Sequence, residues 1–99
     1  MTTFLMGTRI DSSVVGKPTD LEELEKAVVA RVEQHCPDVQ WQESFAILGP
    51  YDYIDRFEAP DLETAQKVAT IVRSFGHARA EVWPATPWDS FKRTIQGLS

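Results

Sequence analysis

Residues 47–61 read ILGPYDYIDRFEAPD, and this stretch decides the fold. Two runs rich in apolar and aromatic residues flank a Gly-Pro pair, which is typical of a β-hairpin with strands over 39–48 and 51–58. If Gly49-Pro50 is a two-residue turn, Glu43 faces Arg56, and opposite charges at facing positions support this register. A longer turn remains the alternative, because two-residue hairpins usually carry Asn-Gly or Asp-Gly.

The chain before the hairpin predicts one strand and one helix. Residues 4–10 are short, apolar and partly β-branched, which favours a strand. Thr19 and Glu22 have the spacing of a capping box and predict a helix start, while Pro37 ends that helix near residues 35–36. The apolar stripe of the helix recurs at helical spacing and consists of Leu21, Leu24, Val28 and Val32.

The chain after the hairpin repeats this pattern. Asp61 is a suitable N-cap for a second helix, and Gly76 is suited to end it. Residues 77–85 alternate between small apolar and larger polar side chains, which predicts a fourth strand. Pro87 at a first helical position predicts a short terminal helix that ends at Gly97. The apolar stripe of that helix is Trp88, Phe91 and Ile95.

The element order is therefore β-α-β-β-α-β plus a terminal helix. This order predicts a ferredoxin-like α+β domain, with a four-stranded antiparallel sheet and both long helices on one face. A chain of 99 residues has room for one hydrophobic core, so residues 1–99 form a single domain.

Composition narrows the function classes. The net charge of −5 disfavours nucleic acid and anionic membranes, which select clustered Lys and Arg. The single cysteine, Cys36, cannot form an internal disulfide, and we expect a cytoplasmic protein with no membrane span. Neither a paired-cysteine or HExxH zinc motif nor a glycine-rich phosphate loop is present, so no metal and no cofactor is expected.

One face of the predicted sheet has no helix to cover it. In the last strand, small residues favour the helix side, which leaves His77, Arg79, Glu81 and Trp83 on the other side. In the first strand, Phe4, Met6 and Thr8 are expected to face the helices. For the hairpin, the set containing Tyr53 and Asp55 and the set containing Ile54 and Arg56 fit the helix side equally well. In either case the uncovered face mixes aromatic and charged side chains, and a second copy of the sheet would cover it.

The hairpin and its flanks resemble the GYD family. In that family a G-x-Y-D sequence opens the third strand, and Gly49, Pro50, Tyr51 and Asp52 match it. The acidic-proline turn and the alanine-rich helix that follow in the family correspond to Ala59-Pro60-Asp61 and the residues after it. The resemblance covers roughly residues 3–95. It implies a dimeric α/β barrel, in which two sheets pack face to face, and therefore a homodimer or higher homo-oligomer.

Candidate site residues are those that could look into such an enclosed space. His77 and Asp55 are candidates for proton transfer, although a solvated histidine at a strand start is the simpler interpretation of His77. Arginines can hold an anionic ligand, and a salt-bridge network in a dimer interface is the alternative role for the charged group. The candidate ligand-binding residues are Arg9, Tyr53, Asp55, His77, Arg79, Glu81 and Trp83.

Three functions remain open from sequence. The first is a small self-associating GYD-like protein that holds a small molecule or has a structural role. The second is a cofactor-free monooxygenase or isomerase of the dimeric barrel group. The third is a regulatory domain that senses a metabolite. An enzyme requires acid and base groups that converge on a vacant volume, whereas a sensor requires a ligand pocket without that pair.

Overall fold

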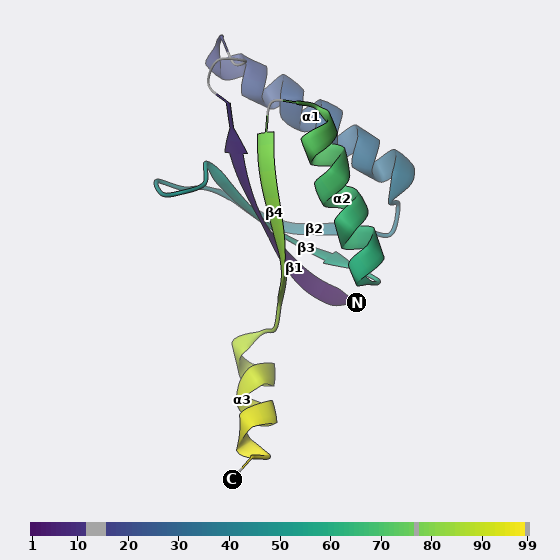
Figure 1. Cartoon of the computed structure of the whole chain (residues 1–99), viewed down its shortest axis with the longest axis vertical. Helices are drawn as coiled ribbons and strands as arrows, with labels where there is room; N and C mark the ends of the chain where they lie inside the picture. Colours follow the sequence, from purple (N-terminus) through teal and green to yellow (C-terminus); the bar gives the residue numbers. More distant parts are fainter. Residues whose placement is uncertain (12–15, 77, 99) are drawn as a thin grey trace.

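The fold is described from a computed structural model, which defines residues 1–11, 16–76 and 78–98 (Figure 1). The four strands form one antiparallel sheet in the order β2-β3-β1-β4. The predicted ferredoxin-like topology is confirmed, including the additional helix at the end of the chain. The strands are β1 (Thr2–Ile10), β2 (Gln40–Ala46), β3 (Tyr53–Ala59) and β4 (Ala78–Ala85), and the helices are α1 (Pro18–His35), α2 (Leu62–Ser74) and α3 (Trp88–Gln96).

The hydrophobic core lies between one face of the sheet and helices α1 and α2. Phe4 of β1 and Phe57 of β3 occupy facing positions, and their rings stack with centroids 5.6 Å apart. Both rings are buried against Val32 of α1 and Val68 of α2. Burial of one such side chain stabilises the fold by roughly 1.5–3 kcal/mol. Phe4, Met6 and Thr8 therefore face the helices, as the sequence predicts.

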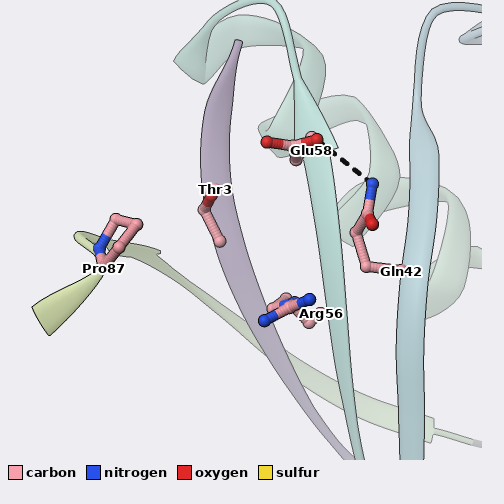
Figure 2. A pocket seen from close by; sticks show the side chains of 5 residues that line it. All are labelled: Thr3, Gln42, Arg56, Glu58 and Pro87. Atoms are coloured by element: carbon pink, nitrogen blue, oxygen red, sulfur yellow. Dashed lines mark hydrogen bonds between the residues drawn. The ribbon is translucent and has the colours of Figure 1, made fainter. Parts of the chain in front are cut away.

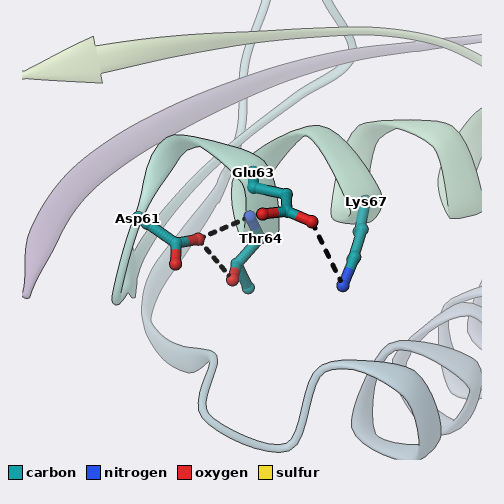
Figure 3. A network of polar contacts seen from close by, with 4 residues as sticks. All are labelled: Asp61, Glu63, Thr64 and Lys67. Carbon is teal, nitrogen blue, oxygen red and sulfur yellow. Dashed lines mark hydrogen bonds and ion pairs between the residues drawn. The ribbon is translucent and has the colours of Figure 1, made fainter.

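Local hydrogen bonds define the ends of α2 (Figure 3). The Asp61 carboxylate accepts hydrogen bonds from the backbone N–H of Thr64 at 2.8 Å and from its hydroxyl at 2.7 Å. These bonds lower the pKa of Asp61. One turn further on, Lys67 forms an ion pair with Glu63 at 3.9 Å. Gly76 follows the helix with a φ of 75°, a conformation that favours glycine. Both predicted ends of this helix are confirmed.

Helix α1 begins earlier than the capping-box pattern predicts. Its N-cap is Lys17 rather than Thr19, and Pro18 occupies the first turn. Proline suits that position because its φ is already helical and its missing N–H would have no helical partner. Asp20 completes the start by accepting hydrogen bonds from the N–H groups of Lys17 at 2.9 Å and Gly16 at 3.2 Å. The prediction of Thr19 as N-cap is therefore wrong.

The hairpin has the predicted register from Glu43 to Ala46, but the register shifts between Trp41 and Glu43, and the connection is longer than two residues. Glu43 pairs with Arg56, Phe45 with Ile54 and Ala46 with Tyr53, as predicted. The ladder nevertheless stops at Ala46 and Tyr53, so residues 47–52 form the connection instead of a two-residue turn. Pro50 cannot donate a hydrogen bond, which fits poorly in a tight two-residue hairpin turn.

Strand β1, rather than the hairpin alone, holds the connection in place. The N–H of Asp52 donates to the carbonyl of Thr8 at 2.9 Å. The Asp52 carboxylate in turn accepts from the N–H of Ile10 at 2.8 Å. Arg9 adds a bond from Nη1 to the carbonyl of Pro50 at 3.1 Å. The Asp52 side chain thus binds the backbone of a residue 42 positions away.

We predict that Asp52→Ala lowers the free energy of unfolding by about 1 kcal/mol, because the Ile10 N–H loses its acceptor. Urea denaturation followed by circular dichroism measures this change. Glu33→Ala, which removes an exposed carboxylate of α1, serves as the control. Equal stability of the two variants would show that the link to β1 contributes nothing.

Candidate functional site

The strand register shows which residues lie on the helix-free side of the sheet, named here the open face. Phe4, Met6 and Thr8 point toward the helices, so the alternate residues of β1 and their partners on β3 and β4 point the other way. The sequence did not decide which side of the hairpin strand faces the helices; in the structure, Ile54 and Arg56 lie on the open face. The open face comprises Leu5, Gly7, Arg9, Glu43, Phe45, Ile54, Arg56, Glu58, Arg79, Glu81 and Trp83.

An aromatic pair lies over the middle of this face. The rings of Tyr51 and Trp83 meet edge to face with centroids 5.5 Å apart. Gly7 lies beneath them: a Cβ atom at this position would come within 2.8 Å of Trp83 Cη2 and 3.0 Å of the Tyr51 ring. Only glycine leaves room for both rings at this point of β1. Tyr51 was expected to open the second hairpin strand, but it lies in the connection before β3 and packs across the sheet onto Trp83 of β4.

A charged group adjoins the aromatic pair. Arg9 of β1 and Arg79 of β4 are direct cross-strand partners. Glu81, two residues after Arg79, faces Gly7 in the next pair on the same side of the sheet. Like charges at facing positions repel each other. The ion pairs of the described residues are Arg56–Glu43, Lys67–Glu63 and Lys92–Asp89, so none of them neutralises Arg79. This part of the face can accept a carboxylate or another anion.

A groove of about 220 Å³ lies at the other end of the open face (Figure 2). Gln42 donates from Nε2 to the Glu58 carboxylate at 3.1 Å, and Arg56 forms an ion pair with Glu43 at 2.6 Å. Both ion-pair partners are about half exposed, so the pair contributes little to stability. Thr3 and Pro87 complete the lining, which puts the start of α3 beside this groove.

Two predicted site residues lie on the other side of the sheet. Asp55 faces Met6 and Ser44, and Tyr53 faces the buried Thr8. Burial raises the pKa of Asp55, while a hydrogen bond with Ser44 lowers it and Glu25 of α1 raises it. Burial likewise raises the pKa of Tyr53. The expectation that Asp55 joins Arg9, Arg79 and Glu81 on the uncovered face is therefore wrong.

The remaining predicted residues divide between the open face and a position outside the described residues. Arg9, Arg79, Glu81 and Trp83 share the open face, as the alternation of their strands predicts. His77 lies outside the described residues. In the described part of the chain, no three His, Cys, Asp or Glu side chains are grouped to hold a metal ion. No described helix is both long and apolar enough to cross a membrane.

The sequence prediction missed Gly7 and Tyr51 as parts of this site. A glycine inside a strand often marks a close approach of another group, and that signal was available at Gly7. For Tyr51, no local pattern could reveal the contact, because its partner Trp83 lies on a strand that is distant in sequence.

We predict that Gly7→Ala destabilises the protein by roughly 1–2 kcal/mol, because the new methyl group displaces Trp83 and Tyr51. Near-ultraviolet circular dichroism should change at the same time. Gly49→Ala is the matched control, since a Cβ there meets its nearest neighbour at 3.8 Å. An unchanged aromatic signal in Gly7→Ala would contradict the described packing.

We predict that Asp55→Asn stabilises the fold at neutral pH. The pKa of Asp55 is raised in the folded state, so the wild type loses stability as the pH rises through the unfolded value toward the folded one. The gain in the variant should therefore vanish when the pH is lowered below the unfolded pKa. Unfolding curves of both proteins across this range measure it, and a gain that persists at low pH would refute this explanation.

Solved structures with the same fold support the topology. The protein TTHA0845 of Thermus thermophilus is 22% identical, with a TM-score of 0.58 over 88% of this chain and 95% of its own. The protein FFRP-DM1 is 20% identical, with a TM-score of 0.58 over 87% of this chain and 100% of its own.

A larger structure shares the fold in part of its length. The leucine response regulatory protein LrpA of Mycobacterium tuberculosis is 8% identical, with a TM-score of 0.54 over 87% of this chain and 51% of its own. These likenesses concern the fold alone. No curated protein matches the sequence significantly.

The family model described as the GYD domain matches residues 4–95. That range includes most of β1 and all of β2, β3 and β4. It also contains the Gly49–Asp52 signature, whose Tyr51 and Asp52 hold the connection against the open face and β1. The chain therefore belongs to the GYD-domain family.

Proposed function

We propose that the protein is a cytoplasmic ligand-binding domain that acts as a homodimer, with two copies packed open face to open face. Arg9 and Arg79 then hold an anionic group of a small molecule in the space between the sheets. The observation that carries this proposal is the facing pair of arginines beside an aromatic pair, on the side of the sheet without helices.

The apolar part of the open face supports the pairing. Leu5 and Ile54 lie on the two central strands and Trp83 on the edge strand β4, yet all three are only half-buried. Contiguous apolar surface of this kind typically marks an interaction site. A two-fold arrangement buries the same patch on both chains, which is the commonest arrangement in small homo-oligomers.

The charged part of the same face supports a ligand. Once covered, Arg9 and Arg79 would lose water, and desolvated like charges require an acidic partner. Glu81 supplies one negative charge for the two arginines. A carboxylate or phosphate group of a small molecule would supply the second through charge-assisted hydrogen bonds.

A binding role fits these groups better than catalysis does. Asp55, the acid that was a candidate for proton transfer, faces the helices rather than the arginines. Metabolite sensing is the second candidate. The fold likeness to a protein described as a leucine response regulator favours this interpretation, because an amino acid also presents a carboxylate.

We predict that Ile54→Lys separates the homodimer into single chains of 11.2 kDa, because it introduces a charge at the centre of the open face. Gln66→Lys adds the same charge on the exposed surface of α2 and should leave the dimer intact. Native mass spectrometry measures both masses. Dimers that survive Ile54→Lys would overturn the face-to-face arrangement.

The same spectra test the ligand. Wild-type dimers should carry an additional small mass, and that mass should be lost in Arg79→Gln while the dimer persists. Dimers without any retained mass that also fail to bind small carboxylates or phosphate would reduce the proposal to a structural dimer.

A further inference from the structure

Helix α3 is an amphipathic helix whose apolar side chains Trp88, Phe91 and Ile95 are exposed. It lies beyond the end of the sheet, and no described helix or strand packs along it (Figure 1). None of its residues is buried, and Trp88 is 67% exposed. The Cα radius of gyration is 15.1 Å, whereas a compact domain of about 100 residues has roughly 13 Å. The chain thus extends an apolar element into solvent.

A helix of this length requires a contact to be stable. It has nine residues, and isolated helices below roughly 12–15 residues are marginal in water. Phe91 and Ile95, both more than 40% exposed, lie on the same side of the helix as Trp88, whose ring centroid is 5.6 Å from that of Phe91. An apolar stripe of this kind is typical of a helix that packs on another surface.

We infer that α3 packs on a second copy of this chain, against the exposed edge strand β2 and the start of the connection that follows it. This inference rests on the proposed function, because it adds a second contact to the face-to-face homodimer. The groove beside Thr3 and Arg56 then gains a wall from the partner's α3, so the enclosed space is incomplete in a single chain.

The chain itself offers the complementary apolar surface. Among the described residues, apart from the first residue and the region of α3, the exposed large hydrophobic side chains are Phe45, Leu48 and Leu62. Phe45 belongs to β2 and Leu48 follows that strand directly. Helix α3 extends away from this region within its own chain (Figure 1). In a two-fold pair, the α3 of each copy can reach the other copy. The apolar stripe of each α3 and the surface that Phe45 and Leu48 form on each partner then cover one another.

The position and the charge of α3 agree with packing on a second copy of the chain. Pro87, its N-cap, lines the groove with Arg56 and Glu58, so the helix leaves the sheet next to the open face. The helix carries one acidic and two basic residues, Asp89, Lys92 and Arg93, in a chain with a net charge of −5. The acidic residue of β2 is Glu43, and the basic side chains of α3 can approach it in the other copy, whereas the net charge of the whole chain disfavours anionic lipid.

The double variant Phe91→Ser/Ile95→Ser tests the inference by sedimentation equilibrium. The homodimer loses four apolar contacts, two from each α3, and only the 41–43% of each side chain that is exposed in the single chain becomes buried, so the dissociation constant should rise by roughly 100-fold to 1000-fold. Both residues are exposed in the single chain, so the fold itself should persist. The matched control is Leu62→Ser, which removes an apolar side chain that is 57% exposed at the start of α2 and should leave the dissociation constant unchanged.

Cross-linking locates the contact. A carbodiimide joins amines to carboxylates that touch, and a mixture of ¹⁴N-labelled and ¹⁵N-labelled chains separates links between copies from links within one. The inference predicts a link between Lys92 of one copy and Glu43 of the other, on the exposed face of β2.

The outcomes separate this inference from the proposed function. A wild-type homodimer that is unaffected by Phe91→Ser/Ile95→Ser overturns the role of α3 and leaves the face-to-face dimer standing. A wild type that remains a single chain overturns both. Binding to phosphatidylserine vesicles that the double variant abolishes, while dimer stability stays unchanged, overturns the inference in favour of a lipid surface.

Discussion

The structure depends on one constraint: a four-stranded sheet has two faces, and α1 and α2 cover only one of them. On the covered side, Phe4 and Phe57 stack and exclude water. On the open face, aromatic and aliphatic side chains stand beside arginines and glutamates. Such a surface is too apolar to be a solvated face and too charged to be a dry core. The ligand-binding homodimer proposed above follows from that conflict.

The family signature has a structural explanation in this chain. Asp52 ties the hairpin connection to β1 through bonds to Thr8 and Ile10. The same attachment brings Tyr51 onto Trp83 above Gly7. The Gly-x-Tyr-Asp sequence therefore orders the surface around the candidate site, and none of these contacts requires the signature residues to take part in a reaction.

The sequence predicted those features that depend on local pattern or on simple pairing. The hairpin register followed from opposing Glu43 and Arg56, and the Asp61 cap followed from a helix-start preference. The facing of β3 could not be predicted, because Tyr53 and Phe57 on one side and Ile54 on the other are all apolar. Period-2 alternation then gives no preferred face.

The length of the hairpin connection and the side of the sheet that Asp55 faces could not be decided from the sequence, for the same reason. Both features depend on β1. The carbonyl of Thr8 accepts a hydrogen bond from the N–H of Asp52, and the register between β1 and β3 places Asp55 on the helix side. Contacts between residues more than forty positions apart leave no trace in local composition. Gly7 was the exception, because a glycine within a strand is a visible signal of close packing.

The central claim is that a second copy of the chain covers the open face in solution. Small-angle X-ray scattering of the wild-type protein over a range of concentrations measures the particle mass directly. We expect a particle of twice the 11.2 kDa chain mass, with a pair distribution that fits two sheets stacked face to face. Particles of 11.2 kDa at every concentration would contradict the claim.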